Sequence, residues 1–148
     1  MSLRDNQDFA GDLSVEDAYA MLEKDERAAL VDVRTQPEWQ FVGVPDLAVL
    51  GKAPIFREWQ TYPTMQIATD FAEGLGDELE RRGADKNSPV IFICRSGARS
   101  RQAAIALTKA GWSRCYNAAD GFEGPLDGER RRGAVGGWRA RGLPWTQS

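Results

Sequence analysis

The chain has 148 residues, of which 42% are hydrophobic and 28% charged, with a net charge of −3, two cysteines and no histidine. This length favours a single domain that can bury its own core without a metal or disulfide. Without histidine, the chain cannot supply Ser-His-Asp triads, Cys-His pairs or histidine-bound metal sites, so any nucleophile must be activated in another way.

The beginning of the chain shows no targeting pattern. Residues 1–12 are polar and acidic, and residues 1–3 could be a cloning remnant. The longest apolar run, residues 90–94, is far shorter than the roughly 20 residues of a membrane-spanning helix. With two cysteines and no secretion signal, we expect a cytoplasmic protein with free thiols and no membrane partner.

Charge is distributed unevenly along the chain. Residues 1–93 carry 18 acidic and 9 basic side chains, whereas residues 94–148 carry 4 acidic and 10 basic ones. The only basic run, Arg130-Arg131-Arg132, has acidic neighbours. Short runs of this kind are usually solvated surface, so we expect no nucleic-acid partner.

In the first half of the chain, helix signals alternate with short apolar runs. A capping pattern predicts a helix over residues 14–24, and residues 29–33 follow as a run of strand length. A second capping pattern at Thr35 begins another helix, and residues 47–50 are a further strand candidate. Residues 51–66 contain glycine, prolines and aromatic side chains without a clean period, which predicts an irregular surface segment.

The second half continues this alternation. Apolar side chains at successive i+4 positions predict a helix over residues 67–82. Residues 89–93 are apolar on both faces, as in a strand covered by helices on both sides. A helix over residues 100–110 and a last strand over residues 114–118 follow. Alternating strands and helices predict an α/β domain with a mainly parallel sheet.

The strongest chemical signal is the segment Cys94-Arg95-Ser96-Gly97-Ala98-Arg99-Ser100, which joins a predicted strand to a predicted helix. A tight loop containing Gly97 before a helix N-terminus turns backbone N–H groups toward the Cys94 sulfur. These amides and the helix dipole stabilise a thiolate. Cys94 is therefore a candidate nucleophile that needs no histidine. Arg99 is the best candidate for an anion-binding side chain, and Arg95 is the second.

Five segments together carry a family resemblance. They are Leu13-Ser14-Val15-Glu16; Val31-Asp32-Val33-Arg34 with Glu38-Trp39; Cys94 to Ser100; Tyr116-Asn117-Ala118-Ala119-Asp120-Gly121-Phe122; and Gly137 to Trp145. In these segments the sequence resembles the single-domain rhodanese-like sulfurtransferases. The resemblance implies one domain over residues 13–145, with residues 146–148 as a tail. The implied fold has three layers, with a central, mainly parallel five-stranded sheet flanked by helices.

The resemblance also implies a reaction. Cys94 takes a sulfane sulfur from a small anionic donor such as thiosulfate and passes it from a persulfide to a thiophilic acceptor, which is a thiol or a protein. The implied donor-binding residues are Arg95, Ser96, Gly97, Ala98 and Arg99. The pair Asp32 and Arg34 is expected to give structural support near this loop, because a charge within an apolar strand needs a partner. No metal and no organic cofactor is implied.

Two other functions stay open. The same thiolate could serve a phosphatase or an arsenate-reductase-like enzyme, although related phosphatases resemble Cys-x5-Arg and this chain has Ser100 at that arginine position. A non-catalytic rhodanese-like binding module is the third reading, and the intact Cys94 argues against it. The family commonly carries Gly-His-Ile-Pro-Gly after the second helix, whereas Val44 stands here in place of that histidine.

Six further side chains could serve either the core or the site. Cys115 lies in a short strand without a glycine-arginine loop, so we expect a core thiol rather than a resolving one. Trp138 and Trp145 are expected to pin the C-terminal segment to the core. Phe56 and Trp59, together with Phe122, are candidates for the mouth of a pocket.

Overall fold

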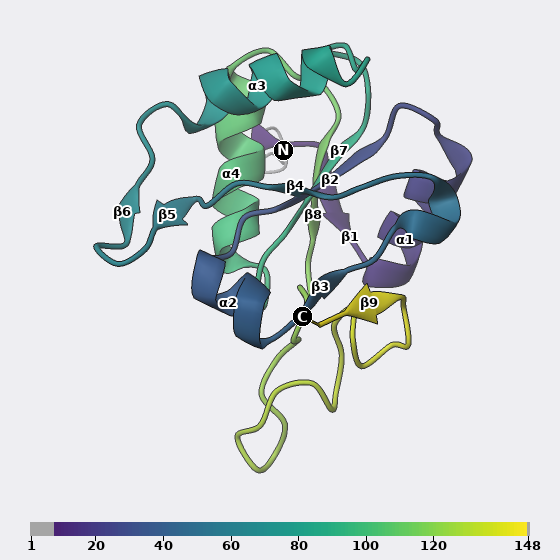
Figure 1. Cartoon of the computed structure of the whole chain (residues 1–148), viewed down its shortest axis with the longest axis vertical. Helices are drawn as coiled ribbons and strands as arrows, with labels where there is room; N and C mark the ends of the chain where they lie inside the picture. The colour runs from purple at the N-terminus through teal and green to yellow at the C-terminus, as the bar shows by residue number, and fades with distance from the viewer. Residues whose placement is uncertain (1–7, 148) are drawn as a thin grey trace, which may run out of the picture.

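A computed structural model describes residues 8–147, and the suggested cloning remnant at residues 1–3 lies outside this range. Its centre is a five-stranded sheet in which every neighbouring pair of strands is parallel. The strand order is β1 (Gly11–Leu13), β8 (Cys115–Ala118), β7 (Val90–Ile93), β2 (Ala29–Asp32) and β4 (Ile55–Phe56). Figure 1 shows α3 (Phe71–Arg81) and α4 (Ala98–Lys109) on one side of this sheet and α1 (Val15–Lys24) on the other. The predicted three-layer α/β fold is confirmed.

Strand β7 shows why the sheet is covered on both faces. All four of its residues are buried. Val90 and Phe92 belong to the core cluster that contains α3 and α4 side chains, whereas Ile91 and Ile93 belong to the cluster that contains α1 side chains. Successive side chains of a strand point to opposite faces, so one apolar strand supplies both cores.

The first two helices begin where the capping patterns predict. α1 (Val15–Lys24) starts after Ser14, whose side chain accepts a hydrogen bond from the Asp17 N–H at 3.0 Å. α2 (Gln36–Phe41) starts after Thr35, whose N–H donates to Glu38 Oε1 at 3.0 Å. In both cases a polar side chain pairs with backbone N–H groups at the helix end.

The prediction of a strand at residues 47–50 is wrong. Ala48–Leu50 is a short 3₁₀ helix. The Asp46 side chain accepts a hydrogen bond from the Ala48 N–H at 3.0 Å, and this local bond bends the chain into a turn. Val49 is 85% exposed, whereas Leu47, just before this helix, is buried in the core cluster that contains α1 side chains.

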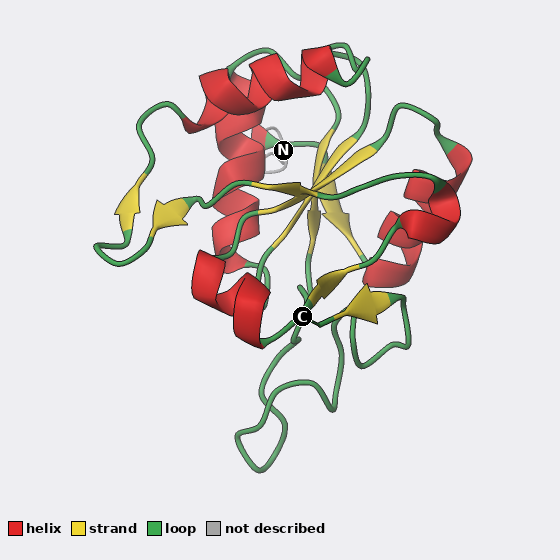
Figure 2. Ribbon diagram, viewed as in Figure 1, coloured by secondary structure: helices red, strands yellow, loops and turns green. Residues whose placement is uncertain are grey.

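Residues 51–66 are more ordered than predicted. The edge strand β4 lies within them, and β5 (Gln60–Thr61) pairs antiparallel with β6 (Gln66–Ile67) in a separate hairpin. Figure 2 shows this hairpin away from the central sheet. Since residue 67 belongs to the hairpin, α3 is shorter than predicted and spans Phe71–Arg81.

Two pairings hold the ends of the domain. β1 begins within the polar segment 1–12, which was predicted to precede the domain, yet it pairs with β8, and Phe9 just before it is buried. β3 (Val44–Pro45) pairs antiparallel with β9 (Trp145–Thr146). Both ends of the described chain are therefore tied to the fold. Within residues 8–147, no helix has the length and apolar character needed to cross a membrane.

Candidate active site

Cys94 directly follows β7, at the carboxyl end of a central strand. In open α/β sheets, ligands bind beyond this end of the strands. The Cys94 residue is only 1% exposed, yet it lines a cavity of about 380 Å³. The other residues that line this cavity are Glu38, Gln60, Met65, Arg95, Ser96, Ala98 and Arg99. The thiol thus lies at the lining of this cavity with almost none of its own surface exposed.

Two backbone amides converge on the sulfur. The Gly97 N–H donates to Cys94 Sγ with an N to S distance of 3.2 Å, and the Ser100 N–H donates to the same atom at 3.3 Å. The Ser100 hydroxyl lies 3.1 Å from Sγ. α4 spans Ala98–Lys109, so both amides belong to its N-terminal end. The positive end of the helix dipole and two N–H donors therefore face the sulfur.

This cradle differs in detail from the predicted one. α4 begins two residues before the predicted start at residue 100, and Gly97 becomes its N-cap. Of the predicted segment 95–99, the Gly97 amide contacts the sulfur, and Ser100 supplies the second amide from just outside it. Arg95, Ser96, Ala98 and Arg99 instead line the cavity.

Gly97 is required by the space around it. Its φ of +109° lies in the region that favours glycine, and a Cβ there would overlap the carbonyl oxygen of Ala119. The segment after β8 also holds the loop by hydrogen bonds. The Phe122 N–H donates to the Cys94 carbonyl at 2.8 Å, and the Glu123 N–H donates to the Arg95 carbonyl at 3.0 Å. Two segments distant in sequence together fix the direction of the Gly97 amide.

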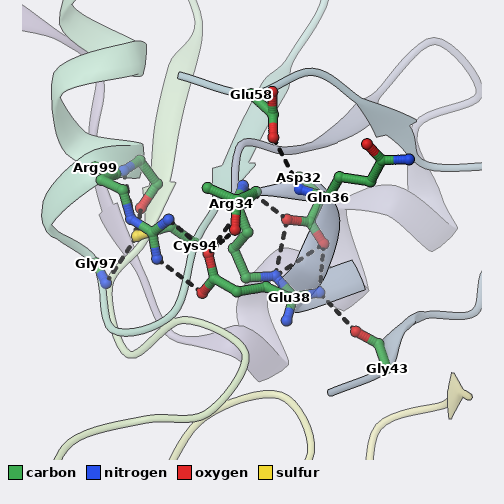
Figure 3. A network of polar contacts seen from close by, with 11 residues as sticks. Asp32, Arg34, Gln36, Glu38, Gly43, Glu58, Cys94, Gly97 and Arg99 are labelled. Atoms are coloured by element: carbon green, nitrogen blue, oxygen red, sulfur yellow. Dashed lines mark hydrogen bonds and ion pairs between the residues drawn. The ribbon is translucent and has the colours of Figure 1, made fainter. Parts of the chain in front are cut away.

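Arg99 forms an ion pair that the sequence did not indicate. Its Nη1 lies 2.7 Å from Glu38 Oε1 and its Nη2 lies 3.0 Å from Glu38 Oε2. Figure 3 shows the two side chains pointing toward one another beside Cys94. Burial alone would raise the pKa of Glu38, but bonds from Arg99 and Thr35 outweigh it and lower that pKa to about 2. Glu38 is therefore a carboxylate at neutral pH, and its negative charge partly neutralises the positive charge of Arg99.

Asp32 and Arg34 form a fully buried ion pair at the end of β2. Arg34 Nη2 lies 2.7 Å from Asp32 Oδ2, and both side chains have no exposed surface. The same Nη2 donates to the Gly43 carbonyl at 2.7 Å (Figure 3). The guanidinium also lies over the Phe122 ring, 4.3 Å from its centroid. Arg34 thus joins β2 to the chain before β3 and to the segment after β8.

The three aromatic residues predicted at the pocket mouth lie elsewhere. Phe56 packs against Trp39, Trp59 packs against Phe71, and Phe122 is buried beneath Arg34. Side chains of the β5–β6 hairpin, Gln60 and Met65, line the cavity instead. The prediction failed because it rested on the presence of aromatic residues alone, whereas all three rings pack against other side chains of the fold.

Cys115 lies in the core, as predicted. It is fully buried, and burial raises the pKa of its thiol to about 11. Its partner in the sheet is Val90, at the opposite end of β7 from Cys94. Four residues along a strand correspond to about 13 Å. Cys115 is therefore too far from Cys94 to form a disulfide with it in this fold.

The two C-terminal tryptophans hold the last segment, as predicted. Trp138 is fully buried and its Nε1 donates to the Pro144 carbonyl at 2.6 Å. Trp145 packs its edge against Phe122, with ring centroids 6.2 Å apart. Val44, which replaces the histidine common in similar sequences, pairs with Thr146 in the β3–β9 sheet. It does not line the Cys94 cavity.

Comparison with known sequences covers most of the chain. The family model described as Rhodanese-like domain matches residues 14–125. An uncharacterized protein of Rickettsia conorii is 38% identical over 128 residues, which make up 86% of this chain and 90% of that protein. The tRNA uridine(34) hydroxylase of Protochlamydia amoebophila is 31% identical over 102 residues, which make up 69% of this chain and 28% of that protein.

Solved structures are similar to this chain over most of its length. A crystal structure of an M. tuberculosis protein superposes with a TM-score of 0.81 and 47% identity, covering 95% of this chain and 99% of that one. The solution structure of the polysulfide-sulfur transferase homodimer from Wolinella succinogenes has a TM-score of 0.57 and 25% identity, covering 97% and 82% of the two chains. The residues matched by the family model include the Cys94 loop and four of the five strands of the central sheet, β2, β4, β7 and β8.

Proposed function

The chain belongs to the family of proteins with a rhodanese-like domain, and we propose that it is a sulfurtransferase that carries sulfane sulfur as a persulfide on Cys94. The observation that carries the proposal is the pair of amides, from Gly97 and Ser100, that point at Cys94 Sγ beside a cavity. Two N–H donors at a helix N-terminus stabilise a sulfur anion, and a thiolate is the reactive form of cysteine.

In the first step the Cys94 thiolate attacks the outer sulfur of a donor such as thiosulfate. A sulfur–sulfur bond forms to Cys94, and the bond between the donor's two sulfurs breaks. Sulfite leaves with the electron pair of that bond. Because sulfite departs as a stable anion, this step needs no general acid, which agrees with a site that has no histidine.

In the second step an acceptor thiolate attacks the terminal sulfur of the persulfide. The new bond joins that sulfur to the acceptor, and the Cys94 thiolate leaves with the electron pair. The same Gly97 and Ser100 amides that stabilise the attacking thiolate in the first step stabilise the leaving thiolate in the second. Thiol exchange of this kind is faster when the leaving thiol has a low pKa.

The charged side chains that line the cavity support a small anionic donor. Arg95 and Arg99 contribute two positive charges to its lining, and Glu38 contributes one negative charge. A small anion carrying sulfur suits this balance, with Arg95, Ser96, Ala98 and Arg99 as its contacts. The Wolinella relative is named a polysulfide-sulfur transferase, which is the same class of reaction. We propose that the reaction takes place in the cytoplasm, where thiols are kept reduced.

The proposal is tested by intact-mass measurement after treatment with thiosulfate. We expect one added sulfur atom on the wild-type chain and on Cys115→Ser, and none on Cys94→Ser. Thiocyanate should then form when cyanide is added. The absence of both the adduct and thiocyanate would refute the proposal. Turnover of an aryl phosphate that is lost in Cys94→Ser would favour the phosphatase reading instead.

A further inference from the structure

We infer that Asn117 is a positioning residue for Cys94, because its side-chain oxygen accepts the hydrogen bond that the Ser100 hydroxyl donates and so leaves the sulfur anion to be bound by backbone amides alone. Asn117 lies in β8, is 3% exposed, and does not touch the sulfur itself. Its role rests on the proposed function, since it governs how well Cys94 attacks a sulfur donor.

The orientation of the Asn117 amide is fixed by two neighbours. Its Nδ2 lies 3.2 Å from the Gly97 carbonyl oxygen and 3.0 Å from Asp12 Oδ1. Both neighbours are acceptors, so each needs one of the two hydrogens on Nδ2. If the amide were turned over, its oxygen would face both acceptors without a hydrogen between them. The Asn117 oxygen, Oδ1, must therefore face Ser100.

The Ser100 hydroxyl has one hydrogen and two neighbours that compete for it. Asn117 Oδ1 lies 2.6 Å from Ser100 Oγ, and Cys94 Sγ lies 3.1 Å from the same atom. Oδ1 has no hydrogen to give, so Ser100 must donate to it. The Ser100 oxygen then presents a lone pair to Cys94 and can accept a hydrogen bond only from the uncharged thiol.

The direction of the Ser100 hydroxyl matters most when Cys94 is a thiolate, which can only accept hydrogen bonds. The thiolate receives the Gly97 and Ser100 N–H bonds, but turning the hydroxyl toward it would leave two oxygens 2.6 Å apart with no hydrogen between them. Asn117 thus withholds a third donor from the sulfur. A thiolate that is stabilised further is a weaker nucleophile. Withholding the proton therefore keeps the Cys94 thiolate reactive toward its donor.

A double-mutant cycle tests this inference. Asn117→Leu removes the acceptor and frees the Ser100 proton for the thiolate, so at a pH at which Cys94 is fully ionised we expect persulfide formation in a single turnover to slow about fivefold. In the Ser100→Ala background no such proton exists, so Asn117→Leu should have no further effect. Interaction between the two substitutions is the expected signature. If Asn117→Leu slows the reaction equally in both backgrounds, its role is merely structural and the inference is wrong.

The maximum rate of Cys94 alkylation by iodoacetamide at high pH gives a second readout. It reports the reactivity of the thiolate without requiring sulfur transfer, so it separates this inference from the proposed function. If wild-type Cys94 forms no persulfide, the proposed function fails, and the alkylation cycle still decides the role of Asn117. We expect the same pattern as for persulfide formation, with an effect of Asn117→Leu only where Ser100 is present.

Asn117→Leu also leaves the Gly97 carbonyl without its partner, so a second variant guards against loss of the fold. Asn117→Ala removes the same acceptor without placing an apolar branch against the Gly97 carbonyl. We expect its maximum alkylation rate to fall as for Asn117→Leu when Ser100 is present, and to show no such fall in the Ser100→Ala background. A wild-type rate in Asn117→Ala, with an unfolding temperature near that of the wild-type chain, would overturn the inference.

Discussion

Glu38 and Arg99, which are 61 residues apart, form a two-bond ion pair at the edge of the Cys94 cavity. The side chains of Arg99 and Glu38 are 18% and 20% exposed, so water screens the pair only in part. Glu38 also accepts hydrogen bonds from the Thr35 N–H and hydroxyl at the start of α2. One carboxylate therefore caps a helix and holds the cation that we propose attracts the donor.

Replacing Glu38 by glutamine should strengthen donor binding. Glutamine can still cap α2, but it no longer neutralises Arg99, so a dianion such as thiosulfate meets a full positive charge. We expect KM for thiosulfate to fall about fivefold, equivalent to about 1 kcal/mol, with kcat nearly unchanged. Initial rates of thiocyanate formation over a range of thiosulfate concentrations measure both constants.

Glu58→Gln is the matched control for this substitution. Glu58 Oε2 also accepts a hydrogen bond from the start of α2, from the Gln36 N–H at 2.8 Å, but it has no bond to Arg99. We expect KM to stay within about twofold of the wild-type value. If the two variants lower KM equally, the effect comes from overall charge and the assigned role of Arg99 is wrong.

The same carboxylate should make folding stability depend on pH. The pKa of Glu38 is lowered from its ordinary value of 4.5 to about 2. A lowered pKa in the folded chain adds stability above pH 4.5, and this contribution is lost as pH falls from 4.5 toward 2. It amounts to about 3 kcal/mol at neutral pH. Urea unfolding at pH 6 and pH 3 should show a larger loss for wild type than for Glu38→Gln, and equal losses would contradict this.

Gly97 should tolerate no side chain. Gly97→Ala combines a φ of +109° with overlap of the Ala119 carbonyl, so we expect a loss of about 3 kcal/mol or more in unfolding free energy. The Gly97 amide would also move from the sulfur, which should slow persulfide formation. Gly51→Ala is the control, because Gly51 has a φ of +71° but open space around it. Its cost should be about 1 kcal/mol, with normal activity. Similar losses for both would mean that the close contact is unimportant.

Local patterns predicted the main elements of the fold. β7 is apolar throughout, and α1 and α2 carry side chains that bond to their own first turns, so each is recognisable without knowledge of the rest. β1 was missed because Gly11, Asp12 and Leu13 have no strand pattern of their own, and pairing with β8 creates the strand. A strand was wrongly predicted at residues 47–50 because the prediction considered their apolar side chains and not the turn that the Asp46 side chain stabilises.

The candidate site also has a part that could be predicted from local sequence and a part that could not. Cys94, Gly97 and the start of α4 lie within a few residues of each other, so their arrangement follows from the loop sequence. Glu38 was noticed only within the capping pattern at Thr35 and within a motif, and neither indicates that it pairs with a residue 61 positions away. Asn117 is 17 positions from Ser100 and was noticed only as part of a motif. Side chains that meet between elements far apart in the sequence leave no periodic signal in a single sequence.

The buried pair of Asp32 and Arg34 should be costly to break from either side. Arg34→Met leaves a buried carboxylate without its partner, and Asp32→Asn leaves a buried guanidinium, so each should lower the unfolding free energy by about 3 to 5 kcal/mol. The double variant should lose less than the sum of the two. Urea unfolding of the three variants measures this coupling.

An exposed ion pair is the comparison. Arg27 and Asp85 lie 3.1 Å apart with side chains 62% and 57% exposed, and Arg27→Met should cost less than about 1 kcal/mol. If Arg34→Met costs no more than Arg27→Met, then Arg34 does not hold β2 to the chain before β3, and its proposed support of the Cys94 loop fails.

Cys94 and Cys115 should differ sharply in reactivity in the folded chain. Burial raises the pKa of Cys115 to about 11, so about one thiol in ten thousand is ionised at pH 7. We expect iodoacetamide to modify Cys94 in wild type and to leave Cys115 unmodified until the chain unfolds, as peptide mass analysis can show. In Cys94→Ser, no modification should occur under native conditions. Since the wild-type fold keeps the two sulfurs apart, Cys115→Ala should retain sulfur transfer, and its loss in a folded variant would assign Cys115 a role in the reaction.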